Sequence, residues 1–341
     1  MGRLLGRQPS FNGQMEMIGS YVTGIMPRPE RLIQVTRLYD RGAADKDCLK
    51  EAFAEATFWA IDCQLAAGFT YLTDGMLEVQ DIFRPLAERL DGIKTGGLAR
   101  WFNNNTFYRK PIIVNDIERK EVVLEEATYC THLPENLPWK AILPAPYTFM
   151  KLSENRFYKD KTELMFRYAE ALRSEMRSLV DLGFKYIQLS DPALVYASTA
   201  RPRDEFSSIS ESLRTATKGI FVQTSLQTFF GDFSHILPDV LDFPVDDLGI
   251  DLYETNLRSL KEYPFDKGVA LGLIDSRNSL VEDMNQLVSV ASEIIDSIYQ
   301  SGVKQIFICP NCDLEFLPWN RAKMKMKAAS EVADRLRKEY V

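Results

Sequence analysis

The sequence predicts one α/β domain of 341 residues, folded as a single (β/α)8 TIM barrel with an inserted β-hairpin. Short runs rich in β-branched and aromatic residues alternate along the chain with longer segments of helical periodicity. Such alternation indicates a parallel sheet, because parallel strands need a crossover connection and cannot be joined by a tight turn. The runs number eight, which is the count that closes a TIM barrel. No low-complexity linker divides the chain into further domains.

Each predicted strand is a short apolar run, and most are followed by a helical pattern. In chain order they are Met17–Tyr21, Phe69–Thr73, Lys140–Leu143, Lys185–Leu189, Ile220–Thr224, Leu248–Leu252, Val269–Ile274 and Lys304–Ile308.

Three helices are predicted most clearly, because start and stop signals agree with the apolar period. Each would lay its apolar stripe against the outside of the barrel. Their start and stop signals are Asp45 with Gly68, Thr162 with Gly183, and the capping box Ser279–Glu282 with Gly302.

Two regions depart from the repeat. The segment 107–126 reads as two strands around a polar turn, which predicts a hairpin beside the barrel. The first crossover, 22–44, is long and contains Pro27 and Pro29.

Composition excludes several classes of protein. The net charge is −7, and the basic residues are scattered among acids, whereas nucleic-acid binding needs a concentrated positive face. No run approaches the ~20 apolar residues that cross a bilayer, and the amino terminus lacks the pattern of a secretory signal. Five cysteines, an odd number, argue against a disulfide framework. We therefore expect neither nucleic acid nor membrane as a partner, and a cytoplasmic protein.

Polar residues gather where the predicted strands end, which is where TIM barrels carry their active sites. Asp191 follows a strand in IQLSDPAL and could hold a cationic group such as an amine, although a role in capping the next loop is about equally probable at such a position. Cys309 and Cys312 have the spacing of half a zinc site. The chain offers only two histidines, His132 and His235, to complete it. A lone pair of this kind is usually inert, so we expect no bound metal.

Several segments together resemble cobalamin-independent methionine synthase, in the family's order and over nearly the whole chain. They are IGSYVTGIMPRPERL, YLTDGMLEVQDIF, LARWFNNNTFYRKP, ILPAPYTF, IQLSDPALV, LQTFFGDF with FPVDDLGIDL, and ICPNCDLEFLP.

The family enzyme has two related barrels, and the carboxyl-terminal one holds a zinc ion through a His-x-Cys pair, a glutamate and a cysteine. The resemblance places Ser225 and Gln227 where that pair belongs, while Cys312 matches the last cysteine and Glu254 could match the glutamate. Two of four ligands do not make a site. The resemblance is therefore closest to the amino-terminal barrel, and we expect this chain alone to lack the catalytic zinc.

The resemblance also suggests binding residues. Arg100, before Trp101, falls where the family places a basic residue toward the polyglutamate tail of its folate substrate, and Arg28 and Arg31 fall near a second basic loop. Cationic side chains suit a tail of carboxylates. The candidate substrate-binding residues are Ser20, Arg100, Trp101, Asp191 and Gln227, and the candidate catalytic residues are Asp191 and Glu254.

The expected function is therefore methyl transfer to homocysteine in methionine biosynthesis, as a half that lacks zinc and works with a separate zinc-bearing barrel. The methyl donor would be a compound such as a folate polyglutamate. One alternative is an autonomous methyltransferase of the same superfamily with another donor or acceptor. Another is a non-catalytic barrel that binds a folate or an amino acid, because fold does not imply function.

Overall fold

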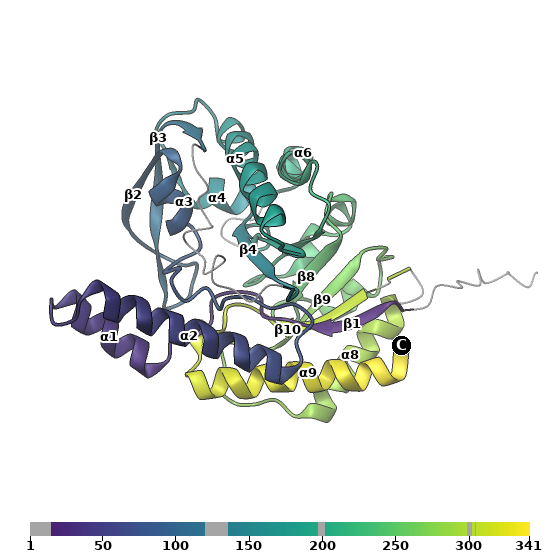
Figure 1. Cartoon of the computed structure of the whole chain (residues 1–341). Coiled ribbons are helices and arrows are strands. Elements are labelled where there is room, and N and C mark those ends of the chain that lie inside the picture. Colours follow the sequence, from purple (N-terminus) through teal and green to yellow (C-terminus); the bar gives the residue numbers. More distant parts are fainter. Residues whose placement is uncertain (1–14, 120–135, 197–201, 299–301, 304) are drawn as a thin grey trace, which may run out of the picture.

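The computed structural model describes residues 15–119, 136–196, 202–298, 302–303 and 305–341. Its centre is a curled parallel sheet of seven strands, in the order β1-β10-β9-β8-β7-β6-β4 (Figure 1). The strands are β1 Met17–Ser20, β4 Lys140–Pro144, β6 Tyr186–Ser190, β7 Gln223–Gln227, β8 Asp247–Asp251, β9 Gly268–Ile274 and β10 Gln305–Pro310. The parallel α/β architecture is confirmed.

The remaining predicted strand, Phe69–Thr73, which is second in chain order, is wrong. This segment forms one isolated bridge, from Leu72 to Trp139, and no regular strand. It nevertheless lies between the two edge strands of the sheet. The Thr70 backbone N–H donates to the Ser20 carbonyl of β1 at 2.9 Å, and the Lys140 N–H of β4 donates to the Leu72 carbonyl at 2.8 Å. The curled sheet is therefore bridged at its seam by an irregular segment.

A buried lysine also crosses this seam. Lys140 is 2% exposed, and its Nζ donates to the Val22 carbonyl at 3.0 Å. The same nitrogen lies 3.1 Å from the centroid of the Tyr21 ring. Burial lowers the pKa of Lys140 well below its usual value, and the nearby Cys309 and Asp247 oppose that shift.

Helices cover the outside of the curled sheet (Figure 1). They are α1 Glu30–Asp40, α2 Lys46–Ala67, α3 Arg84–Arg89, α4 Pro146–Leu152, α5 Lys161–Asp181, α6 Phe206–Thr217, α7 Leu257–Leu260, α8 Met284–Ile298 and α9 Trp319–Tyr340. No helix in the described ranges is long and apolar enough to cross a membrane.

The predicted helix signals are confirmed for α2. Asp45 accepts a hydrogen bond from the Cys48 N–H at 2.8 Å, and Gly68 ends the helix with φ +79°, in the left-handed region that favours glycine. For α5 the cap is Asp160 rather than Thr162. The Ser279–Glu282 capping box is wrong: α8 begins at Met284.

Glu282 has a different partner. Its carboxylate pairs with the buried Nζ of Lys325 on α9 at 2.6 Å and also accepts the Asp275 N–H. A buried charged group such as the Lys325 ammonium needs a partner of opposite charge. Glu282 therefore pairs with Lys325 instead of capping a helix.

The region predicted as a hairpin belongs to a second, three-stranded sheet beside the barrel. It contains β2 (Asp91–Arg100), β3 (Phe107–Glu118) and the short β5 (Glu154–Asn155), with β2 and β3 antiparallel. β2 precedes the predicted range, and residues 120–126 lie outside the described residues.

The barrel strands alternate between two environments. Ile187, Leu189 and Leu226 belong to the main hydrophobic core under the helices. Their neighbours along the strands are mostly polar and equally buried, among them Gln188, Ser190, Ser225, Gln227, Asp247 and Asp251. Because successive side chains of a strand point to opposite faces, these polar residues line the inside of the curled sheet.

Candidate active site

The candidate site lies on the inner wall formed by β6 and β7, toward the carboxyl ends of the strands. Gln188 of β6 pairs in register with Ser225 of β7, and Ser190 pairs with Gln227 one step further along. All four residues are at most 2% exposed. Two neighbouring strands therefore present a compact set of amide and hydroxyl groups to the interior.

Several polar atoms of this wall lack partners. Among the described residues, no group hydrogen-bonds to Gln188 Oε1, Asp191 Oδ2 or Gln227 Oε1, whereas the Ser225 side chain hydrogen-bonds to Tyr186. A buried polar group without a partner costs about 1–3 kcal/mol, so such atoms need a water or a ligand. Amide and carboxylate oxygens accept hydrogen bonds, which favours a group rich in N–H donors, such as an ammonium.

Asp191 is held by its neighbours rather than by a counter-ion. It follows β6 and is fully buried. Thr148 of α4 donates its hydroxyl to Asp191 Oδ1 at 2.5 Å, and the same hydroxyl accepts the Ala193 N–H at 3.1 Å. Burial raises the pKa of Asp191 to about 7, and the Thr148 hydrogen bonds oppose the rise. This carboxyl therefore changes charge near neutral pH while its second oxygen stays available.

A glycine makes room for Gln227. Gly249 of β8 pairs with Gln227 in register, and a Cβ at this position would come within 2.0 Å of Gln227 Oε1. Only glycine lets the amide lie across the neighbouring strand.

The next strand ends along the sheet, those of β8 to β10, are built differently. Asp251, at the end of β8, accepts hydrogen bonds from the Phe230 and Tyr253 backbone N–H groups at 3.2 and 3.1 Å. It also accepts one from the Asn311 side chain at 3.2 Å. Burial raises the pKa of Asp251 to about 6, which these bonds and the nearby Arg277 oppose. Ser276 ties its loop to the one after β10, through Asn311 and the Cys312 carbonyl.

The two cysteines of the CPNC segment are buried thiols. Burial raises the pKa of Cys309 to about 12 and raises that of Cys312 as well. Thiols with raised pKa values are poor nucleophiles, because the thiolate is the reactive form.

Glu254 does not join the cysteines in a buried cluster. Its carboxylate is 38% exposed and pairs with Arg277 at 2.7 Å, whereas the buried carboxylates whose charges act on Cys312 are Asp313 first and then Asp251. Asp251 ends the strand in GIDL and belongs to the polar rim that the sequence predicts at the strand ends, but it was not chosen as a candidate site residue.

The described residues contain no group of three or more His, Cys, Asp and Glu side chains that could hold a metal ion. His132 lies outside the described residues, and His235 is an exposed side chain 3.7 Å from Asp232. Where a His-x-Cys pair would supply imidazole and thiolate, β7 supplies the hydroxyl of Ser225 and the amide of Gln227. The residues present do not fit a zinc centre.

A narrow cavity of about 20 Å³, no larger than a water molecule, lies beside this wall and brings together segments far apart in sequence. It is lined by Ser190, Trp101, Tyr108 and Phe229 together with the carboxylates Asp81, Asp313 and Glu315. A larger hollow of about 490 Å³ shares Ile25, Gln80 and Glu315 with it and continues past Arg28 and Trp319.

The carboxylates of the first cavity were not among the predicted site residues. Burial raises the pKa of Glu315, the neighbouring Asp313 raises it further, and Arg28 opposes the rise. The signal that could have found Asp313 and Glu315 is their place directly after the last strand, in CDLE, whereas no such signal marks Asp81.

The remaining predicted binding residues are spread around the mouth. Trp101 lines the first cavity, while Arg100 is an exposed residue at the end of β2. Ser20 is buried at the end of β1, where its N–H donates to the Thr70 hydroxyl at 3.2 Å. Arg28 donates twice to the Leu77 carbonyl, and Arg31 forms an exposed ion pair with Glu55.

Comparison with known proteins decides the family. Residues 16–335 match the family model described as cobalamin-independent synthase, catalytic domain. The chain belongs to the cobalamin-independent methionine synthase family. The match is to the catalytic domain, whereas we expected the nearest likeness in the amino-terminal barrel.

Relatives of the family are of the same length. A methionine synthase of Saccharolobus solfataricus is 29% identical over 330 residues, which cover 96% of this chain and 97% of the relative. One from Sulfurisphaera tokodaii is 28% identical over 315 residues, covering 92% and 90%. The matches thus cover nine-tenths or more of both this chain and these relatives.

Solved structures agree on the fold. A B12-independent methionine synthase from Shewanella sp. W3-18-1, in complex with selenomethionine, superposes with a TM-score of 0.79 at 19% identity. The match covers 94% of this chain and 98% of that one. A second family structure, from Listeria monocytogenes, gives a TM-score of 0.71 at 16% identity, over 94% of this chain and 99% of that one.

Proposed function

We propose that this chain takes part in methionine biosynthesis by supporting methyl transfer to homocysteine, as a barrel without zinc that works beside a separate zinc-bearing barrel. The observation that carries the proposal is the inner face of β7. It presents Ser225 and Gln227 where the family resemblance places the imidazole and thiolate ligands. A thiol becomes nucleophilic at neutral pH when a cation holds it as thiolate, and these two side chains cannot hold that cation.

The inner wall is the proposed site for the amino-acid substrate. Asp191 Oδ2 and Gln227 Oε1 are buried acceptors without partners in the described part of the chain, and they suit the N–H groups of an ammonium. Ser20 ends β1, at the opposite edge of the sheet from β6 and β4. Asp191 is the one of these groups that carries charge, so it would orient the substrate and hold a proton as pH changes.

The proposed methyl donor is of the folate type. The hollow of about 490 Å³, which Arg28, Glu315 and Trp319 line, is large enough for a planar ring, whereas the cavity beside Trp101 and Phe229 holds only about one water molecule. Arg100 follows at the rim and would meet the carboxylates of a glutamate tail. We place this activity in the cytoplasm, in keeping with free cysteines.

Reconstitution tests the proposal. The purified chain is mixed with a purified zinc-bearing single barrel, homocysteine and methyltetrahydrofolate, and methionine is quantified. We expect the mixture to produce methionine at least about tenfold faster than either protein alone, and Asp191→Asn to abolish the gain. Asp266→Asn, at an exposed position, is the matched control and should retain the full gain. A mixture no faster than the zinc-bearing barrel alone overturns the proposal.

A second candidate is an autonomous methyltransferase of the same superfamily with another donor or acceptor. Two observations favour it: the family model is that of the catalytic domain, and the relatives are matched over nine-tenths of their length or more. Methyl transfer to a thiol by this chain alone, from any folate or corrinoid donor, would establish it. Elemental analysis of the same sample then shows whether a metal takes part.

The seam segment also has a proposed role. We propose that residues 69–73 stand in the place of the eighth strand, so that the chain is a (β/α)8 barrel with one irregular member. The hydrogen bonds to Ser20 and from Lys140 on its two sides support this assignment.

A further inference from the structure

The outer faces of α2 and α9 carry an exposed apolar patch that the methyl-transfer proposal does not use. On α2, Phe58 and Trp59 are each 48% exposed, and Leu65 lies two turns further along, 45% exposed. Met324 of α9 is 48% exposed. Single exposed apolar residues are ordinary, but two adjacent aromatic side chains with aliphatic neighbours on one face indicate a contact surface.

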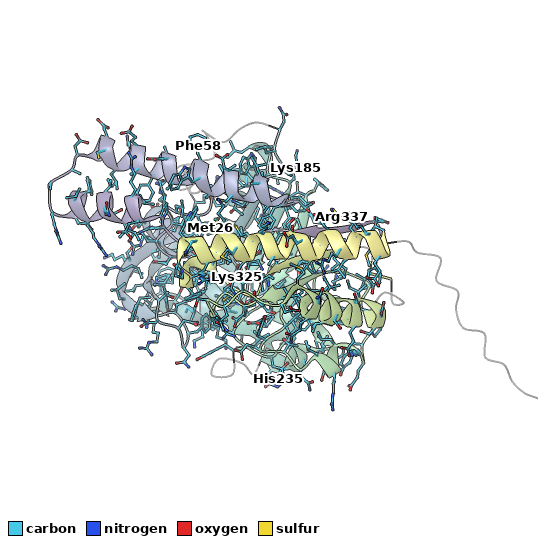
Figure 2. The ribbon with its side chains drawn as sticks, turned by 90° about the horizontal axis from the view of Figure 1, so that it is seen from below. Met26, Phe58, Lys185, His235, Lys325 and Arg337 are labelled. Carbon is cyan, nitrogen blue, oxygen red and sulfur yellow. The ribbon has the colours of Figure 1, made fainter. Side chains whose placement is uncertain are left out.

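The two helices lie side by side and run in the same direction (Figure 2, where Phe58 is labelled on α2 and α9 runs in front). Lys323 acts electrostatically on Cys63 of α2. Five residues further along α2, a Cβ on Gly68 would lie 3.5 Å from the Ser330 hydroxyl. Position 62 of α2 is therefore level with position 323 of α9, and 66 with about 327.

The charges on the two helix faces are opposite. The exposed face of α2 carries the acid Asp62 among its apolar residues. The exposed face of α9 carries Arg321, Lys323 and Lys327 around Met324, and Lys327 pairs with Glu331 one turn further along. An aromatic face with one acid thus lies beside a mainly basic one on the same surface.

Such a surface is complementary to itself. A two-fold axis that runs along the helices, between them, places α2 of one copy on α9 of the other at the same level, and the reverse contact follows by symmetry. Asp62 would then face Lys323 of the second copy, and Trp59 would face Arg321 of the second copy. An aromatic ring under a guanidinium is itself a favourable contact.

We propose that this chain forms a symmetric dimer through the α2–α9 face, with Phe58, Trp59 and Leu65 packed on the mainly basic face of α9 in a second copy. The proposal rests on the exposed aromatic pair and the charge complementarity, and is independent of the proposed methyl transfer. It also leaves the mouth of the barrel open, because α2 and α9 cover the outside of the sheet.

Charge reversal with rescue tests the dimer. One variant carries Asp62→Lys with Ala66→Lys on α2, and the other carries Lys323→Glu with Lys327→Glu on α9. Mass is measured by sedimentation equilibrium over about 1–100 µM. The wild-type chain should dimerise, and each variant alone should dissociate with a Kd raised at least about tenfold, because like charges then face each other. An equimolar mixture should form the heterodimer, since both contacts regain opposite charges.

Controls separate this outcome from misfolding. Asp239→Lys and Lys218→Glu reverse exposed charges on other elements and should dimerise like the wild-type chain. Rescue in the mixture itself requires that both variants are folded. A wild-type chain that stays monomeric over the whole range overturns the proposal, as does a dimer that both α2 and α9 variants leave intact.

Discussion

The two sides of the barrel mouth are equally buried but differ in how their polar groups are satisfied. On the β8–β10 side, Asp251 accepts three hydrogen bonds, and Ser276 and Asn311 join the neighbouring loops. On the β6–β7 side, Gln188, Asp191 and Gln227 each leave an atom without a partner among the described residues. The first side holds the loops in place. On the second side, buried polar atoms lack hydrogen-bond partners that a ligand can supply, and this lowers the stability of the free protein.

The largest expected effect comes from the satisfied side. Asp251→Ala removes an acceptor used by two backbone N–H groups and the Asn311 amide, which leaves buried donors without partners. We expect the free energy of unfolding to fall by about 3 kcal/mol in urea denaturation at pH 8. The exposed Asp266→Ala should change it by less than about 0.5 kcal/mol. If the free energy of unfolding of Asp251→Ala fell by less than about 1 kcal/mol, the proposed difference between the two sides would be wrong.

The next effect has the opposite sign. The pKa of Asp191 is about 7 in the folded chain, above the value of about 4 in an unfolded chain. Between these values the folded protein binds a proton that the unfolded chain does not, so stability falls as pH rises through this window. Asp191→Asn removes this ionisation. Between pH 5 and pH 8, its free energy of unfolding relative to that of the wild type should therefore rise by on the order of 2 kcal/mol.

Denaturation of both proteins at the two pH values measures this gain. Asp247 and Asp251, whose pKa values are about 6, titrate in both proteins and cancel in the comparison. A difference that does not change with pH would mean that Asp191 is not protonated in the free protein.

A smaller effect is expected at the rim. Arg277 pairs with Glu254, and both side chains are about one-third exposed, so Arg277→Met should cost no more than about 1 kcal/mol. Because Arg277 lowers the pKa of Asp251, its removal should raise that pKa above about 6. NMR titration of ¹³C-labelled aspartate carboxyls records the shift, and an unchanged or lower pKa would contradict it.

The smallest change in stability is expected within the incomplete wall. Within the described part of the chain, the Gln227 side chain forms one long hydrogen bond, 3.4 Å to the Thr228 carbonyl. Gln227→Leu should therefore change the free energy of unfolding by less than about 0.5 kcal/mol. The same variant should lose binding of an amino-acid ligand, measured by calorimetry. Unimpaired binding would remove Gln227 from the site.

Periodicity and caps predicted much of the fold, and the errors have physical causes. Met17–Tyr21 and Val269–Ile274 match β1 and β9 within one residue, because these strands are mostly apolar. Ile220–Thr224 is three residues early for β7, since the actual strand reads QTSLQ and turns its polar residues inward. Phe221, which drew the prediction forward, is 93% exposed.

The second sheet was partly missed for a related reason. β2 reads DGIKTGGLAR, which has few of the β-branched and aromatic residues that favour strands. Its pairing with β3 supplies what its own composition lacks. Local sequence does not report a partner strand.

The sequence indicated where the candidate site lies, at the strand ends, but not all of the residues that line it. Asp191 and Gln227 lie at strand ends, as expected, and the structure places them on adjoining strands. Gln188 was not foreseen, because a glutamine inside an apolar run gives no sign of which face it lines. Glu254 was named in place of Asp251, because three residues beyond a strand cannot be placed without the turn that follows it.

The irregular segment at the seam has a mechanical consequence. Elsewhere, neighbouring strands are joined by ladders of several hydrogen bonds, whereas β1 and β4 are linked through isolated bonds and the Lys140 ammonium that reaches the Val22 carbonyl. Thermal fluctuations should therefore open the sheet between β1 and β4 before they separate any other pair of neighbouring strands. Amide protons of β1 and β4 will exchange with deuterium sooner than those of β7 and β8. Removal of the Lys140 side chain will increase this difference in exchange rate.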